Sequence, residues 1–322
     1  EMTSSLVGSE MCIRDRDVRE QLYSQLEDYM GLSSTKKKMD SSEKSGGTTL
    51  KRKSSEQSSS SSSSKALSKN TLAIKVNGKT VKGSAQNIVG RVVEAEMGAS
   101  FREEALKAQA VAAYTYIRYN NQKGTIPSLP AKSSVSAKVE DAVEQVIGEA
   151  LYYQGEYINA TYCASNAGNS VDSENVWGGY LPYLRSVESP GDTTLKAYGA
   201  VKRFSEEEIA QYIEDNLDVD PYDYSDPDEW FEDEEYINGR YVDSIRVCGR
   251  RLSGREVREE LMEFALPSVA FEVEYDDGEF IFTTYGYGHG VGMSQQGADY
   301  FAQRGWDYEE ILTHYYTGVT LK

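Results

Sequence analysis

A carboxylate set in an apolar helix is the first feature of this sequence that suggests chemistry. Apolar side chains recur every three or four positions over residues 85–97, so Ile88, Val92 and Glu96 are expected on one face. Glu94 lies about 200° around that helix and is expected to face outward. Apolar surroundings favour the protonated form of a carboxyl group, the form that a general acid needs. A helix-end carboxylate that pairs with a buried arginine, or caps the next helix, fits the same pattern.

Neighbouring elements must position this carboxylate. An alternating stretch over residues 72–76, followed by an Asn-Gly turn, predicts a β-hairpin before the helix. After the helix, Ser100–Glu103 has the pattern of a capping box, and the alanine-rich run behind it predicts a second helix over residues 105–119. Its alanines imply close packing. Gln109 is the polar residue within it that we single out as a candidate substrate contact.

The composition bounds the class of partner. The chain of 322 residues carries 52 acidic and 34 basic side chains, a net charge of −18. This balance argues against nucleic acid as the main partner, because phosphate binding needs a basic face. Tyrosine, with 24 residues, outnumbers phenylalanine, with 8. A tyrosine ring has an apolar face and a polar rim, which suits both sugar binding and ordinary amphipathic cores.

The first seventy residues are expected to add nothing to the fold. Ser5–Arg16 (SLVGSEMCIRDR) reads as a translated sequencing adapter, so residues 1–16 are excluded from fold reasoning. Residues 17–70 have the composition of a low-complexity Ser/Lys-rich linker, a disordered tether with one short helix near its start. No run of eighteen apolar residues occurs. Attachment to a membrane would therefore need an N-terminal anchor missing from this chain.

Three blocks of the remaining sequence resemble one family. Residues 92–116 (VVEAEMGASFREEALKAQAVAAYTY) are similar to a signature of the stage II sporulation protein D and amidase enhancer family, V-V-A-A-E-M-P followed by E-A-L-K-A-Q-A-V-A-A-R-T-Y. Residues 158–192 include VWGGYLPYLRSVESPGD, which resembles the second family block. Residues 285–318 include YGYGHGVGMSQQGA and ILTHYYTG, which resemble the third. The blocks follow the family's order and cover most of residues 85–322.

The resemblance implies a lytic transglycosylase of the bacterial cell wall. Such an enzyme cuts peptidoglycan glycan strands after N-acetylmuramic acid, preferably strands stripped of stem peptides, in wall remodelling or endospore engulfment. The C6 hydroxyl of that sugar attacks and leaves a 1,6-anhydro end, so the second carboxylate of ordinary glycosidases is not obligatory. Glu96 matches the glutamate of the family's A-E-M motif and is the candidate acid and base. The implied setting is extracytoplasmic, secreted or membrane-anchored.

The chain departs from the family pattern at several positions, and they keep a second function open. Gly98 replaces a proline, Tyr114 an arginine, Cys163 a histidine and Ala167 a glycine. Some relatives are not lytic and enhance a cell-wall amidase instead. The alternative is therefore a non-catalytic, wall-binding enhancer of an N-acetylmuramoyl-L-alanine amidase, with other engulfment proteins as further partners. Retention of Glu96 favours the enzyme, and the cysteine favours the enhancer.

Further side chains are candidates for substrate binding. Arg185 is expected to face the lactyl carboxylate of a peptide-free muramic acid, with a structural salt bridge as the alternative. Ser165, in the second block, is a further candidate contact. Tyr285, Tyr287 and His289 alternate with glycines, which let a backbone approach a ligand closely, and are expected to line a sugar groove. A tightly packed loop with a structural histidine is the alternative. The spacing and its context do not fit a dinucleotide-binding loop.

No cofactor and no metal is expected. Cys163, Cys248, His289 and His314 do not form any pair with the local spacing of metal ligands. A disulfide between Cys163 and Cys248 is possible outside the cell, and the sequence alone does not decide it.

The region between the second and third blocks completes the predicted architecture. The acidic stretch over about 205–240 is expected to be a solvated insert, which begins with a short helix and continues as turns. Short strands around a helix follow it. The fold class is therefore α+β, with a single mixed domain over residues 71–322.

Overall fold

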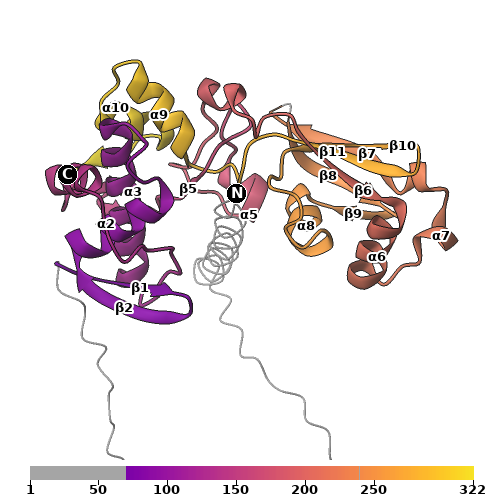
Figure 1. Cartoon of the computed structure of the whole chain (residues 1–322), viewed down its shortest axis with the longest axis horizontal. Helices are drawn as coiled ribbons and strands as arrows, with labels where there is room; N and C mark the ends of the chain where they lie inside the picture. Colours follow the sequence, from indigo (N-terminus) through magenta and orange to yellow (C-terminus); the bar gives the residue numbers. More distant parts are fainter. Residues whose placement is uncertain (1–69, 239) are drawn as a thin grey trace, which may run out of the picture.

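The fold consists of two lobes of mixed helices and short sheets. The computed structural model describes residues 70–238 and 240–322, and the predicted adapter and all but the last residue of the predicted linker lie outside them. Helices combined with small, mostly antiparallel sheets confirm the predicted α+β class. Each lobe surrounds its own hydrophobic core. The first and last described segments, indigo and yellow in Figure 1, share one lobe, and residues 200–284 form most of the other.

The first lobe is mainly helical. Its elements, in chain order, are β1 Thr71–Val76, β2 Lys79–Ser84, α2 Ala85–Glu96, α3 Glu103–Gln122, α4 Ala137–Val146, β3 Leu151–Tyr153, β4 Glu156–Tyr157, β5 Tyr162–Cys163, α5 Ser173–Trp177, the 3₁₀ helix η1 Pro190–Thr194, β12 Met293–Ser294, α9 Gln295–Gln303, α10 Tyr308–Tyr315 and β13 Thr320–Leu321. Helix α3 lies at its centre and is buried along most of its length, in contact with α2, α4, α9 and α10.

The elements before and around Glu96 form for identifiable reasons. The predicted hairpin is confirmed, with β1 and β2 antiparallel and Asn77 and Gly78 in the turn at φ values of 48° and 74°. Ser84 caps α2, and its hydroxyl accepts the backbone N–H of Asn87. The predicted capping box at the start of α3 is wrong. Arg102 is the N-cap, and its backbone N–H donates to Asp299 of α9 instead, across 2.6 Å.

The second lobe is built on two three-stranded sheets, β10-β11-β6 and β7-β8-β9. Its elements are β6 Ala200–Ser205, α6 Glu206–Leu217, α7 Pro221–Tyr224, the 3₁₀ helix η2 Pro227–Glu229, β7 Phe231–Ile237, β8 Tyr241–Val247, β9 Arg250–Leu252, α8 Gly254–Glu256, the π-helical turn η3 Val257–Leu261, β10 Phe271–Asp276 and β11 Glu279–Thr284. The core combines aliphatic side chains with buried aromatic ones, and the ring of Trp230 stacks on that of Phe280, with centroids 5.4 Å apart.

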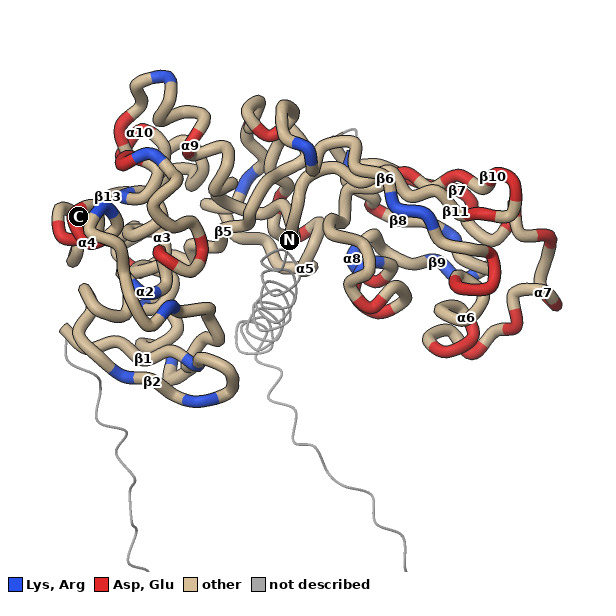
Figure 2. The backbone as a smooth tube through the Cα atoms, in the orientation of Figure 1, with Lys and Arg blue, Asp and Glu red and all other residues tan. Residues whose placement is uncertain are grey.

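The acidic stretch is part of this second core rather than a solvated insert. Its acidic side chains alternate with apolar ones, so α6 buries Ile209 and Ile213 while its glutamates face outward. Trp230 is fully buried, and β7 pairs with β8. Figure 2 shows the acidic residues gathered over α6, α7, β7 and β10, around the outside of the lobe. Among the described residues, no helix is long and apolar enough to cross a membrane.

Candidate active site

Glu96 lies at the last position of α2, where the helix meets the start of α9. Its side chain is half-buried. The side-chain amide of Gln295, the first residue of α9, donates to Glu96 Oε2 across 3.0 Å. Gln295 is itself 2% exposed, so its position is fixed by packing. The expected apolar helix face therefore ends in a carboxylate that a neighbouring helix holds by a hydrogen bond.

Glu94 has a structural role, and the prediction that it faces outward is wrong. Its Oε2 atom accepts hydrogen bonds from the backbone N–H of Ser136, at 3.1 Å, and from the Ser136 hydroxyl, at 2.7 Å. Ser136 is the N-cap of α4. The carboxylate of Glu94 thus ties α2 to the start of α4. A carboxylate bound to the start of another helix is thus found at Glu94, and that helix, α4, is the second one after α2.

A buried carboxylate, Asp192, organises the backbone next to Gln295. It accepts hydrogen bonds from the backbone N–H of Asn166 (2.9 Å), the Ser189 hydroxyl (2.7 Å) and the Ser294 hydroxyl (2.8 Å). Burial raises the pKa of Asp192 from 3.8 to about 6, and the three hydrogen bonds limit that rise. Ser294 caps α9 and immediately precedes Gln295. Asp192 therefore helps to fix the helix end from which Gln295 reaches Glu96.

Glycines make this close packing achievable. A Cβ atom on Gly297 of α9 would lie 2.0 Å from the Tyr315 hydroxyl and 2.4 Å from that of Ser189. One on Gly191 would lie 2.4 Å from the side chain of Tyr300. Real Cβ atoms do not approach other atoms so closely, so any side chain here would push α9 away from η1.

The glycine-rich segment before β12 packs against protein. A Cβ atom on Gly292 would lie 2.2 Å from the Thr161 carbonyl oxygen, and one on Gly290 would lie 2.4 Å from the ring of Tyr241. Both glycines have positive φ, at 78° and 76°. His289 is 1% exposed, its Nδ1 atom accepts the Val291 backbone N–H, and its ring lies 4.9 Å from that of Trp177. The geometry matches the packed-loop alternative for this histidine.

The predicted substrate-binding residues do not all come together. Ser165 and Tyr287 lie side by side, because their backbones exchange two hydrogen bonds of 2.9 and 3.2 Å. Tyr285 turns its hydroxyl to Glu272 of β10 across 2.9 Å, beneath the guanidinium of Arg240. Gln109 is fully buried in α3, with no hydrogen-bond partner for its amide among the described residues.

The guanidinium of Arg185 is already paired with carboxylates of this chain. Its guanidinium makes a two-pronged contact with Glu174, with one bond of 2.7 Å, and lies 3.3 Å from Asp172. The same group lies over the ring of Tyr180, 4.4 Å from its centroid. The hydrogen bonds to Glu174 raise the pKa of Arg185 and lower that of Glu174. This is the structural salt bridge that stood as the alternative for Arg185.

The two described cysteines form no disulfide and lie in different lobes. Cys163 donates to Asn166 Oδ1 across 3.0 Å, and Cys248 belongs to the second core. Burial raises the pKa of the Cys248 thiol to about 11. Within residues 70–238 and 240–322, no group of three or more His, Cys, Asp or Glu side chains has a geometry that would hold a metal ion.

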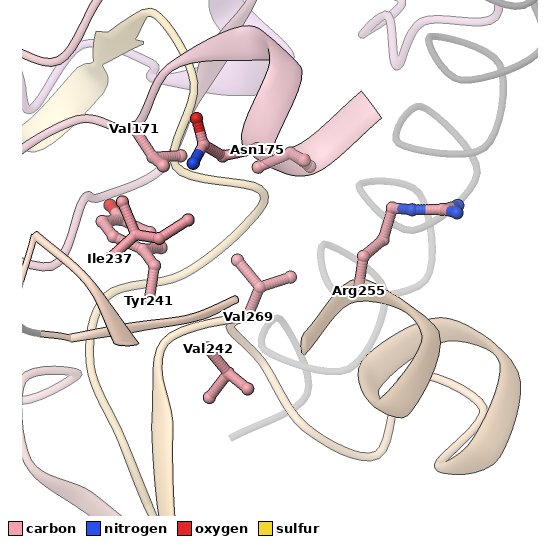
Figure 3. Close-up of a pocket in the computed structure, with 8 residues that line it drawn as sticks. Val171, Asn175, Ile237, Tyr241, Val242, Arg255 and Val269 are labelled. Carbon is pink, nitrogen blue, oxygen red and sulfur yellow. The ribbon is translucent and has the colours of Figure 1, made fainter. Parts of the chain in front are cut away.

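A small cavity marks the junction of the lobes but is no substrate site. It is lined by Val171 and Asn175 from the first lobe and by Tyr241, Val242 and Arg255 from the second (Figure 3). Its volume of about 10 Å³ is roughly that of one water. The Tyr241 hydroxyl crosses the junction, accepting the Ala167 N–H and donating to the Asn169 carbonyl.

Comparison with known proteins identifies the family. A family model described as stage II sporulation protein matches residues 79–153, which contain Glu96. Over 274 residues the chain is 32% identical to the stage II sporulation protein D of Bacillus amyloliquefaciens, covering 76% of this chain and 77% of that protein. The chain belongs to the stage II sporulation protein D family. The protein of the same name from Bacillus subtilis (strain 168) is 31% identical with the same coverage. The resemblance seen in the sequence is thus confirmed.

A further relative has a name that points to a different role. An amidase enhancer of Bacillus subtilis (strain 168) is 28% identical over 290 residues, covering 71% of this chain and 39% of that protein.

The three family blocks meet around Gln295 and Asp192. The sequence analysis singled out neither residue. Gln295 of the third block contacts Glu96 of the first. Asp192 of the second block accepts from Ser294 of the third, and β5 and β12 of these blocks pair in parallel. The available signal was the presence of both residues within the blocks and, for Gln295, its place directly after Ser294, which caps α9.

Proposed function

We propose that this chain is a peptidoglycan lytic transglycosylase in which Glu96 is both general acid and general base. The observation that carries the proposal is the half-buried carboxylate at the end of α2, held by the Gln295 amide, in a chain of the stage II sporulation protein D family. A carboxyl group in such a place, oriented by a fixed donor, has the features required for proton transfer to a bound sugar.

The reaction needs one carboxyl group and no activated water. Protonated Glu96 gives its proton to the glycosidic oxygen, the bond from C1 of N-acetylmuramic acid to that oxygen breaks, and the departing sugar keeps the electron pair as a hydroxyl. The C6 hydroxyl of the muramic acid bonds to C1 and returns its proton to Glu96. The product has a 1,6-anhydro ring, and the carboxyl group is restored. Attack from within the same sugar gives a large advantage through proximity.

Gln295 would support this cycle through the ionised form of the carboxyl group. An N–H donor bonds an ionised carboxylate more strongly than a neutral acid, so the contact at Oε2 stabilises Glu96 after it has given up its proton. The same contact fixes the direction of the side chain, as positioning for proton transfer requires.

An amidase enhancer is the second candidate. The relative of that name favours it, as does the buried Cys163, which stands where the family pattern has a histidine and donates to Asn166. In this reading the domain binds the wall and stimulates an N-acetylmuramoyl-L-alanine amidase without cutting glycan. Both candidates place the protein outside the cytoplasm, in contact with peptidoglycan strands.

Analysis of released muropeptides separates the two. The chain is incubated with peptide-free glycan strands, and the products are identified by mass. Strands that gain 1,6-anhydro-muramic ends support the enzyme. Strands that are bound but uncut, together with faster amidase action when the chain is added, would replace it with the enhancer.

A further inference from the structure

A groove lined by tyrosines lies at the end of α3 opposite to Glu96. Its volume is about 390 Å³, within the range of sites that hold small organic ligands. The groove lies between the end of α3, the β3–β4 hairpin and the segment after α5. The four aromatic residues of its lining are Tyr119, Tyr153, Tyr157 and Tyr183.

The rings of this tyrosine groove are held in place by one another. Tyr153 packs against Tyr183 with centroids 5.7 Å apart, and Tyr157 against Tyr152 with centroids 4.7 Å apart. Tyr183 is 7% exposed, and its hydroxyl accepts the backbone N–H of Asn159. Tyr153 and Tyr157 remain half-buried, so part of each ring faces the groove. Aromatic surfaces fixed in this way lose little conformational entropy when a ligand stacks on them.

The rim of the tyrosine groove is polar and close to neutral. Lys123 Nζ donates to the Tyr119 hydroxyl across 2.9 Å, and the exposed side chains of Gln122 and Glu156 also line the groove. One cation and one anion give no strong preference for a charged ligand. Flat apolar rings surrounded by hydroxyl, amide and charged groups suit a pyranose, which has C–H faces and a hydroxyl and acetamido edge.

The tyrosine groove is too far from Glu96 to belong to the same subsite. Gln295 of α9 binds Glu96, and Asp299 of the same helix binds the N-cap of α3, Arg102, so Glu96 lies near the start of α3. Tyr119 is near the other end of that helix. At 1.5 Å per residue, the two ends are roughly 25 Å apart.

We propose that the tyrosine groove is an accessory saccharide site that binds N-acetylated amino-sugar units of a glycan strand away from Glu96. The ligand class rests on the proposed function, because a protein that works on a long polymer gains affinity from a second contact with it. The site anchors the protein on a strand whether or not the strand is cut.

Binding by the full-length chain tests the proposal. The Glu96→Gln chain, with and without Tyr157→Ala, is titrated with peptide-free glycan strands and with a soluble N-acetylglucosamine oligomer. We expect Tyr157→Ala to weaken binding of both ligands about tenfold, and Tyr157→Phe, which keeps the ring, to bind nearly as the parent does. Tyr236→Ala is the matched control, because Tyr236 is a 41% exposed tyrosine of the second lobe.

A second variant keeps the test valid if loss of Tyr157 disturbs folding. Gln122→Trp introduces bulk from an exposed position on the rim and leaves all four tyrosines intact, so it should also weaken binding. Unchanged affinity in both variants would overturn the proposal. If the wild type makes no anhydro ends, the proposed function is contradicted. The binding measurements still test the tyrosine groove in that case, because they do not depend on cleavage.

Discussion

Gln295 Nε2 and Glu96 Oε2 lie 3.0 Å apart, although the two residues are 199 positions apart in the chain. The contact joins the first residue of α9 to the last residue of α2, so it depends on correct packing of the first lobe. It makes Gln295 a direct support of the proposed catalytic carboxylate.

Removing this support should slow the reaction. Gln295→Ala deletes the amide donor, so we expect kcat to fall about tenfold or more, as for loss of a hydrogen bond to a charged group, with a smaller effect on KM. The assay is the rate of anhydro-muramic product from peptide-free strands. Gln296→Ala is the control, because that half-buried glutamine is the next residue on the same helix. Equal rates for wild type and Gln295→Ala would show that the contact has no part in catalysis.

Asp192 should make stability depend on pH in an identifiable direction. Burial raises its pKa from 3.8 to about 6, so the folded protein holds this proton more tightly than the unfolded chain. The contribution of Asp192 to the free energy of unfolding is therefore fully present below about pH 4. It is lost as the pH rises to about 6, and Asp192 adds no further change above that. The loss amounts to up to about 3 kcal/mol.

Urea unfolding of wild type and Asp192→Asn at several pH values measures this effect. Asparagine does not titrate, so the unfolding free energy of the wild type should fall relative to that of the variant between pH 4 and pH 7. Contributions shared by both proteins cancel in the difference. Parallel curves over that interval would mean that Asp192 titrates normally.

Glu94 should matter for stability and not for chemistry. Its carboxylate accepts two hydrogen bonds from Ser136 at the start of α4, so Glu94→Ala should lower the unfolding free energy by about 1–2 kcal/mol. Product formation per folded molecule should stay at the wild-type level. A Glu94→Ala protein with full stability but impaired turnover would reverse the roles assigned to the two carboxylates of α2.

Arg185 should also behave as a structural residue. Its guanidinium is bound to Glu174 and Asp172, so Arg185→Ala leaves both carboxylates without this partner and should cost about 1–2 kcal/mol of stability. Affinity for peptide-free strands should change less than tenfold. The measurements are thermal unfolding and strand binding, made on the same preparation. A stable variant that no longer binds strands would return Arg185 to the substrate site.

The local elements around Glu96 were predictable, because they follow from spacing and turn chemistry. The β1–β2 hairpin and helices α2 and α3 appear within a few residues of their expected limits. The partners of those elements were not predictable. Asp299 replaces the expected cap of α3, and Ser136 turns Glu94 inward, because both contacts come from helices distant in sequence.

The second core escaped sequence reasoning for a related reason. Acidic side chains dominate the composition of residues 205–240. The apolar side chains between them form a core only when β7, β8 and β11 are brought together by the fold. Buried Trp230 illustrates this, because its stacking partner Phe280 lies fifty positions later in the chain. The packed state of His289 likewise depends on Trp177, which belongs to a different block.

The rate of anhydro-muramic end formation by Glu96→Gln tests the central claim most directly. Glutamine keeps the size of the side chain and an oxygen that accepts from Gln295, but it has no transferable proton. The account predicts that product formation from peptide-free strands falls by a factor on the order of 10² to 10⁴, while strand binding and the melting temperature stay near wild type. Anhydro-muramic ends that form at the wild-type rate in the Glu96→Gln protein would contradict it.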